Sequence, residues 1–326
     1  MTQPLPYVEP LAHGILAIDT GFHRPMFDAA YLLVENGRGA FIDTGTNHAL
    51  PRLLAAVDAA GLTPDAIDFV IATHVHLDHA GGAGLLMRHL PKAKLVVHPR
   101  GARHMIDPTA LLAGARAVYG DEEMARSYGD VVGVPAGRVL QTTDGMTIQL
   151  AGRPLAFIDT PGHARHHHCI WDERSRSFFT GDTFGLSYRE FDTPRGAWIT
   201  PTTTPVQFEP GPLRASVERM LAYRPEAMNL THYGRVGDVQ RLGELFLAQL
   251  DEMVALAASV AATQSTGRVR HAALEAGLKA IALRSLRAHG CTLSDERIAE
   301  LLALDFELNA QGLAIWLDRK PHLERS

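Results

Sequence analysis

The stretch from Thr73 to Gly82, THVHLDHAGG, constrains this chain more than any other feature, and it directly follows an apolar run typical of a strand. Alternate residues of an extended segment point the same way, so His74 and His76 can face one metal ion together. Asp78 and His79 follow after the chain turns, and can face a second ion. Four metal-competent side chains within six positions argue against a merely solvated loop. The stretch therefore predicts a metal site at the end of a strand.

The order of strand and helix patterns around this stretch predicts an α/β fold. Residues 31–34 and 40–43 have strand patterns joined by a glycine-bearing turn, and residues 48–61 have the apolar spacing of a helix. A further strand pattern follows at residues 93–99, and strand patterns return from residue 139 onward. Strands that alternate with helices in this way are typical of α/β domains.

The character of the chain changes near residue 237, where three helical patterns begin. The second pattern ends at Gly290, and the third opens with Ser294 as its N-cap. We therefore expect a catalytic domain over residues 1–236 and a C-terminal helical region over residues 237–326. The apolar face of the last pattern can cover the site, pack on its own domain or form a homodimer interface.

Composition and charge exclude several classes of protein. The formal net charge of −5 provides no basic field to attract nucleic acid or anionic lipid. The two cysteines, Cys169 and Cys291, lie far apart, so neither a disulfide framework nor a cysteine zinc site is expected. The first residues lack the pattern of a signal peptide, and no run reaches the roughly 18 uncharged apolar residues of a membrane span. We expect a cytoplasmic protein with a small-molecule substrate and no nucleic-acid or membrane partner.

The histidine-rich stretch resembles the H-x-H-x-D-H signature of the metallo-β-lactamase superfamily. An upstream DTG matches at Asp43, and three more motifs follow in the family's order, namely DTPGH with His163, FFTGD with Asp182 and LTH with His232. Five ordered motifs over residues 31–234 are specific to this fold. The resemblance implies a four-layer αβ/βα sandwich of the α/β class, with the helical region as a C-terminal extension.

The resemblance also implies a dinuclear metal centre with imidazole and carboxylate ligands. Its ligands would be His74, His76 and His163 for the first ion, Asp78, His79 and His232 for the second, and Asp182 as the bridge. This ligand set suits zinc, iron or manganese, and zinc is the favoured choice. The resemblance assigns Asp43 a supporting role rather than ligation, with an ordinary turn at the end of a strand as the alternative.

Three more histidines, at positions 166 to 168, follow His163 closely. We expect His167 to support the ligands or the fold. His166 and His168 flank it in an extended segment and should face solvent or a neighbouring element. Replacing His163 should strip the metal, whereas replacing His166 or His168 should not.

Two cations that share a hydroxide lower the pKa of the bound water toward 7, so the hydroxide can attack a carbonyl or phosphorus centre. Asp78 is the candidate catalytic residue, because a ligand beside the nucleophile can hold it and shuttle its proton. Four residues are candidates for substrate contact, with ordinary packing as the alternative: Tyr188, Arg189, Trp198 and Tyr233.

The ligand set and the helical tail are similar to those of hydroxyacylglutathione hydrolases, the glyoxalase II type. The stretch after Asp182 departs from the GCGR of those enzymes, and Gly185 stands where related lactonases place a tyrosine. We predict a glyoxalase-II-like metallo-hydrolase that cleaves a thioester, an ester or a lactone. Two alternatives stay open: an enzyme with one iron ion similar to persulfide dioxygenases, and a metal-bearing binding or regulatory protein with incidental hydrolysis.

Overall fold

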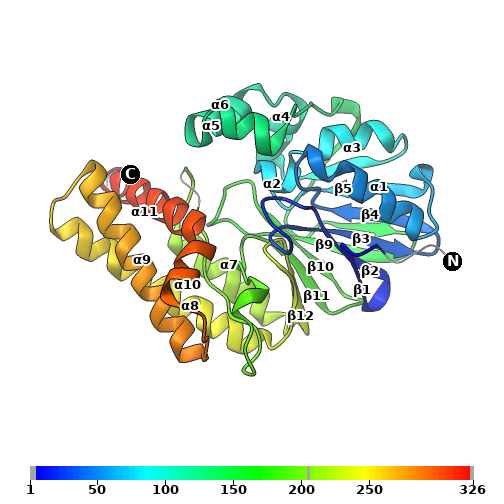
Figure 1. Cartoon of the computed structure of the whole chain (residues 1–326). Helices are drawn as coiled ribbons and strands as arrows, with labels where there is room; N and C mark the ends of the chain where they lie inside the picture. Colours follow the sequence, from blue (N-terminus) through cyan, green and yellow to red (C-terminus); the bar gives the residue numbers. More distant parts are fainter. Residues whose placement is uncertain (1–4, 204–205, 324–326) are drawn as a thin grey trace. The chain divides into compact units, whose positions relative to one another are not determined.

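The structure is a computed structural model that describes residues 5–203 and 206–323, and it divides into two compact units (Figure 1). We call the first the sandwich unit; it comprises Met1–Asp159, His166–Gly181 and Pro225–Val236. We call the second the helical unit; it comprises Thr160–Arg165, Asp182–Arg224 and Gly237–Ser326. Residues 1–4 and 324–326, the outer ends of the two predicted domains, lie outside the described residues.

The first sheet of the sandwich unit has seven strands in sequence order. Pairing is antiparallel from β1 to β4 and parallel from β4 to β7, and helices connect the parallel strands as they must. The predicted hairpin is present, with Asn36 and Gly37 both at positive φ in its turn. The strands are β1 Val8–Leu11, β2 Ile15–Asp19, β3 Ala29–Glu35, β4 Arg38–Ile42, β5 Ile67–Ile71, β6 Lys94–Val97 and β7 Val139–Gln141.

The second sheet has six strands in the order β13-β12-β11-β10-β9-β8. All its pairs are antiparallel except β11 with β12. The strands are β8 Thr147–Leu150, β9 Arg153–Asp159, β10 His168–Asp172, β11 Ser177–Gly181, β12 Ala227–Leu230 and β13 Gly234–Val236. Two of its connections, β9 to β10 and β11 to β12, leave the sandwich unit and return to it.

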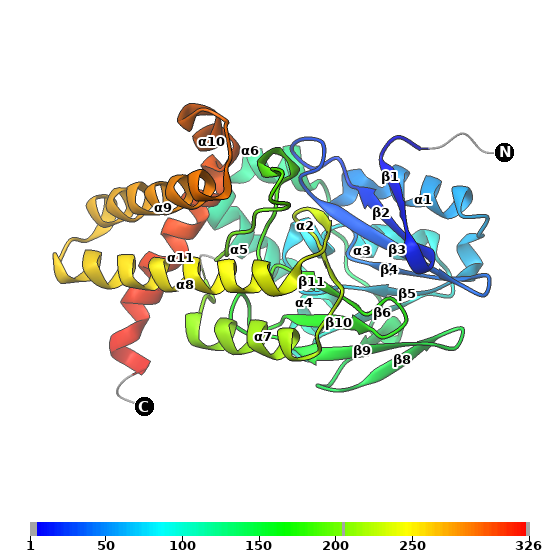
Figure 2. The same cartoon turned by 90° about the horizontal axis from the view of Figure 1, so that it is seen from below.

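Two apolar layers hold the sandwich unit together. One lies between the two sheets, where side chains such as Leu33 and Ile71 meet Phe157 and Phe179. The other packs helices on the opposite face of the first sheet, as Figure 1 and Figure 2 show for α1 and α3. The helices of this unit are α1 Leu50–Ala59, α2 Leu77–Ala80, α3 Ala83–His89, α4 Pro99–Ile106, α5 Thr109–Tyr119 and α6 Asp121–Glu123.

The helical unit contains the predicted C-terminal helices and one helix that the sequence pattern did not reveal. That helix is α7, and the third predicted helical pattern divides at Leu302 into two helices. Ser294 caps the first of them as expected, accepting a hydrogen bond from the backbone N–H of Arg297. The helices are α7 Pro210–Ala222, α8 Val239–Ala262, α9 Gly267–His289, α10 Asp295–Leu301 and α11 Ala303–Leu323.

Helix α8 is long and apolar enough to cross a membrane by length and composition, and 33% of its most apolar window is buried. One such helix is weak evidence for a membrane span, because a helix packed inside a protein meets the same criteria. Here α8 packs against α7 and α9, and α9 packs against α11.

The architecture agrees with the predicted fold class, since two mixed sheets are flanked by helices and a helical extension follows. One junction between the two units lies at Val236 and Gly237, and the division into a catalytic domain and a helical region stays a prediction. The helical unit, however, also includes residues 182–224. These residues join it because side chains of its helices hold them: Gln249 of α8, for example, donates to the carbonyl of Ile199.

Candidate metal centre

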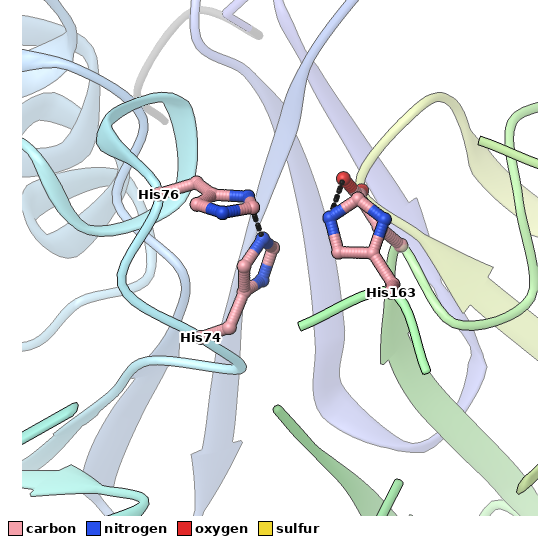
Figure 3. A group of neighbouring side chains, drawn as sticks. His74, His76 and His163 are labelled. Carbon is pink, nitrogen blue, oxygen red and sulfur yellow. Dashed lines mark hydrogen bonds and ion pairs between the residues drawn. The ribbon is translucent and has the colours of Figure 1, made fainter. Parts of the chain in front are cut away.

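The histidine-rich loop begins where β5 ends and continues into the short helix α2. His76 has an extended backbone and caps this helix, so His74 and His76 lie on one side of an extended segment. His74 Nε2 lies 2.8 Å from His76 Nδ1, and Figure 3 shows the two rings meeting edge to face. The alternation predicted from the sequence therefore brings two imidazole nitrogens to one point.

Asp78, His79 and His232 form a second group within the sandwich unit. Their ligand atoms lie within 4.8 Å of one another. Asp78 Oδ2 is 3.4 Å from His232 Nε2 and 3.6 Å from His79 Nε2. Two of these residues belong to α2 and the third follows β12, so the fold brings together residues that are remote in sequence.

The buried carboxylate of Asp43 is the hub that orients this loop. It accepts hydrogen bonds from His79 Nδ1 at 2.8 Å and from the backbone N–H of Thr73 at 2.8 Å. The hydroxyl of Thr73 also donates to Asp43, and its oxygen lies 3.2 Å from His74 Nδ1. Thr231, the residue before His232, donates to the same carboxylate. This geometry agrees with the supporting role predicted for Asp43.

His232 is held from its other side by a main-chain group. Its Nδ1 donates to the carbonyl oxygen of Phe27 at 2.9 Å. An imidazole that donates from Nδ1 carries its lone pair on Nε2, and metal-binding histidines are usually held in this way. His74, His79 and His232 all direct Nε2 away from their supporting contacts, so Nε2 is the nitrogen that would bind zinc, iron or manganese.

The helical unit contributes the pair His163 and Asp182. His163 Nε2 lies 3.2 Å from Asp182 Oδ2, a contact that Figure 3 marks with a dashed line. The Nδ1 of His163 donates to the carbonyl oxygen of Thr202 at 3.3 Å. Gly162 makes the approach possible, because its φ of 132° disfavours other residues and a Cβ there would lie 2.3 Å from the backbone nitrogen of Leu213. His163 is therefore held in the same way as His79 and His232: a hydrogen bond holds its Nδ1, and its Nε2 faces a carboxylate oxygen.

Asp28 is a buried acidic residue near the second group that the sequence analysis missed. One of its carboxylate oxygens accepts from the Thr20 hydroxyl at 2.6 Å, and the other has no hydrogen-bond partner among the described residues. Burial raises the pKa of Asp28 to about 7, an effect that nearby His232 and His79 oppose. An acidic residue immediately before the apolar run of residues 29–34 was the signal that could have indicated it.

His167 packs directly against a predicted metal ligand. Its ring stacks on that of His74 with a centroid separation of 4.7 Å. A Cβ at Gly181 would lie 2.6 Å from His167 Nε2, so the glycine before Asp182 gives this ring its space. The contacts agree with a supporting role for His167.

His166 and His168 are both buried, so the solvent-facing alternative is wrong and both face neighbouring elements. The His166 ring lies 5.5 Å from that of His76. His168 Nδ1 lies 2.9 Å from the hydroxyl oxygen of Thr142, and burial lowers the pKa of His168 to about 3. A run of polar residues entering a strand gave no indication that the strand would be buried on both faces.

The aromatic candidates for substrate contact are packed within the helical unit. Tyr188 and Trp198 are 1% and 0% exposed. The Tyr188 hydroxyl donates to Asp305 at 3.2 Å, and Trp198 Nε1 donates to the hydroxyl of Ser285 at 2.9 Å. Because helices α11 and α9 hold both residues, the packed-loop alternative is favoured for them.

Two further candidates also make contacts of a structural kind. Arg189 donates to the carbonyl oxygen of Ser187, two residues before it, and pairs with Asp192 at 3.4 Å. Tyr233 is buried in the apolar layer between the two sheets. Substrate contact by these residues stays a prediction.

Comparison with known proteins identifies relatives of this chain. A family profile described as the metallo-beta-lactamase superfamily matches residues 24–232. The metallo-beta-lactamase fold-containing protein ST1585 of Sulfurisphaera tokodaii is 25% identical over 228 residues, which cover 68% of this chain and 79% of the relative. The acyl-coenzyme A thioesterase MBLAC2 of Gallus gallus is 31% identical over 194 residues, which cover 53% of this chain and 64% of the relative.

The hydroxyacylglutathione hydrolase of Serratia proteamaculans is 29% identical over 160 residues, which cover 49% of each chain. The matches with this hydrolase and with MBLAC2 thus span about half to two thirds of the relatives' lengths. The solved structure of ST1585 aligns with a TM-score of 0.60 at 23% identity and covers 85% of this chain and all of that one. At such identity the structural likeness supports the fold alone, and it agrees with the predicted sandwich.

Proposed function

Because the chain belongs to the metallo-β-lactamase superfamily, we propose that it is a hydrolase that depends on two divalent metal ions, with zinc favoured. The observation that carries the proposal is the orientation of the histidines: in His74, His79, His163 and His232, a partner holds Nδ1 while Nε2 points toward other ligand atoms. The proposed ligands are His74, His76, Asp78, His79, His163, Asp182 and His232.

The order of the family motifs supports this ligand assignment, since DTPGH and GD occur in the expected places after the histidine-rich loop. Divalent ions bound to these residues would supply Lewis acidity and activate water for attack on a carbonyl group. The protein residues supply orientation: Asp43 directs His79 and, through Thr73, His74.

Asp78 is the residue that we propose to move the proton. Its side chain is 24% exposed, whereas His79 and His232 beside it are buried, so Asp78 can meet both solvent and substrate. A water molecule that adds to a carbonyl carbon must lose a proton, and a carboxylate at this position can accept it. The departing thiol or alcohol then takes up a proton, which the same carboxyl group can return.

A thioester of a small molecule is the substrate class that we favour over esters and lactones. Three relatives support this choice by name: an acyl-coenzyme A thioesterase, an atrochrysone carboxyl ACP thioesterase and a hydroxyacylglutathione hydrolase. A thioester carbonyl is also more electrophilic than an ester carbonyl, and a thiolate leaves readily. Hydrolysis would yield a carboxylic acid and a thiol.

The test compares thioesters, esters and lactones with full-length protein loaded separately with zinc, manganese and iron. Thiol release can be followed with a disulfide reagent, because Cys169 and Cys291 are both buried. We expect thioester turnover with two metal equivalents, and its loss in His74→Ala. One iron per chain with oxygen uptake on a persulfide would overturn the proposal in favour of a dioxygenase. Tight ligand binding without turnover of any class would overturn it in favour of a binding protein.

A further inference from the structure

The direction of His163 depends on one main-chain oxygen in an irregular segment. His163 Nδ1 donates to the carbonyl of Thr202, which lies outside every helix and strand. The hydrogen bonds of regular secondary structure therefore do not hold this carbonyl in place. Whatever fixes the segment around Thr202 also fixes the direction of His163 Nε2.

The side chain of Asn309, on helix α11, holds this segment on both sides of Thr202. The backbone N–H of Thr203 donates to Asn309 Oδ1 at 2.7 Å, and Asn309 Nδ2 donates to the carbonyl of Pro201 at 3.4 Å. These two partners also determine which way the amide faces, because an N–H needs an acceptor and a carbonyl needs a donor. One amide group thus braces both neighbours of the residue that holds His163.

The surroundings of Asn309 indicate that its polarity serves these contacts. Asn309 is buried, and nearby positions on the same helix, Phe306, Ala310 and Leu313, are buried and apolar. A buried amide is unfavourable unless its hydrogen bonds are satisfied, so an apolar residue would suit mere packing better. The helix itself is fixed by its packing against α9.

We infer that Asn309 is a positioning residue for the metal ligand His163. Its amide places the Thr202 carbonyl, the carbonyl fixes the tautomer and direction of the imidazole, and the imidazole presents Nε2 beside Asp182. The inference rests on the proposed function in so far as His163 binds metal. It gives the helical extension a part in metal binding that lies beyond the family's ligand motifs.

The experiment measures metal affinity in the full-length protein, by competition between metal-free protein and a chromophoric chelator for zinc. Asn309→Leu removes both hydrogen bonds while keeping the branched shape of the side chain, and we expect zinc affinity to fall about 10- to 100-fold, the usual effect of losing an outer contact to a ligand. Asn309→Asp keeps the acceptor for Thr203 and should lose less. Gln311→Ala is the matched control, because Gln311 lies on the same helix and contacts Glu307 instead; its affinity should equal that of the wild type.

The absorption spectrum of the cobalt-loaded protein provides a second readout that does not depend on activity. A displaced imidazole should alter the cobalt spectrum in Asn309→Leu and leave it unchanged in Gln311→Ala. Thermal unfolding of the metal-free variants identifies any general loss of stability. Such a loss by itself would change neither the zinc affinity nor the cobalt spectrum of the protein that remains folded.

His163→Ala separates this inference from the proposed function. If His163→Ala weakens zinc binding and Asn309→Leu does not, the positioning role is wrong while the ligand assignment stands. If His163→Ala binds zinc as the wild type does, the ligand assignment itself is wrong, and the inference falls with it. Should Asn309→Leu fail to fold, the comparison of Asn309→Asp with Gln311→Ala decides by the same affinity measurement.

Discussion

The two units support their candidate ligands in different ways. In the sandwich unit, Asp43 follows strand β4 and holds His79 directly, and Thr73 after β5 links it to His74. In the helical unit, His163 rests on an irregular segment that Asn309 of a distant helix braces. Strand ends keep their register through the sheet, whereas an irregular segment depends on side chains that hold it. The comparison teaches that the candidate ligands of the sandwich unit are supported by residues at strand ends, whereas His163 of the helical unit is supported by polar contacts to a segment without regular structure.

The largest effect should come from removing one ligand in each unit. His74→Ala and His163→Ala should each lose bound metal and lower thioesterase activity by about 10³-fold, because a metal Lewis acid contributes several kcal/mol and each 1.36 kcal/mol is tenfold. Metal content by elemental analysis and initial rates check this prediction. His168→Gln is the control and should retain its metal. Full metal occupancy in His163→Ala would show that His163 is not a ligand.

The second-largest effect should come from removing the Asp43 carboxylate, which is the hub of the histidine-rich loop. Asp43→Ala leaves the N–H of Thr73, the hydroxyl of Thr231 and His79 Nδ1 without their acceptor in a buried place. We expect the free energy of unfolding to fall by about 2–5 kcal/mol and metal affinity to fall as well. Urea denaturation of metal-free protein measures the first effect. Unchanged stability would show that Asp43 is not the hub that its contacts indicate.

A smaller effect should follow when the contact between Trp198 and helix α9 is removed. Ser285→Ala leaves the buried indole N–H of Trp198 without its acceptor, which costs about 1–3 kcal/mol of stability. KM should stay unchanged, because Trp198 is packed rather than open to substrate. A raised KM at unaltered stability would restore Trp198 as a substrate contact and count against the packed-loop interpretation.

The smallest effect near neutral pH is the pH dependence of stability that His168 confers. Burial lowers the pKa of His168 from 6.5 to about 3 in the folded protein, so between these values the unfolded chain binds the additional proton. Stability must therefore fall as the pH drops below 6.5, by up to about 1.4 kcal/mol per pH unit from this one group. His168→Gln should flatten the acid limb measured by urea denaturation of metal-free protein. An equally steep limb in the variant would assign the effect to other groups.

Local spacing was enough to predict that His74 and His76 of the histidine-rich loop come together. The alternation at His74 and His76 implied that both face one point, and the structure places their nitrogens 2.8 Å apart. The role of Asp43 came from a motif, and its contacts agree with that role. Spacing worked here because the chain is extended and then turns within a few residues, so sequence distance and spatial distance correspond.

Other features gave no usable signal in the sequence. The carbonyls of Phe27 and Thr202 hold ligands, but every residue has a carbonyl, so no pattern could single them out. Asn309 stood within a helical pattern as one polar residue among many. The burial of His166 and His168 also escaped prediction, because it depends on elements that pack over β10 and the turn before it.

By itself, the sequence determined which residues are candidate ligands, their order along the chain and the α/β class of the fold. These depend on side-chain chemistry and on short-range periodicity, both of which are written directly in the order of residues. Only the tertiary structure decided which nitrogen of each imidazole is held, which backbone oxygen holds it, and which buried side chain fixes that oxygen. Those choices arise from contacts between segments that are remote in sequence. A hydrogen bond needs an acceptor about 3 Å from its donor and nearly in line with the N–H or O–H bond, and only the packing of the folded chain brings the two groups into that position.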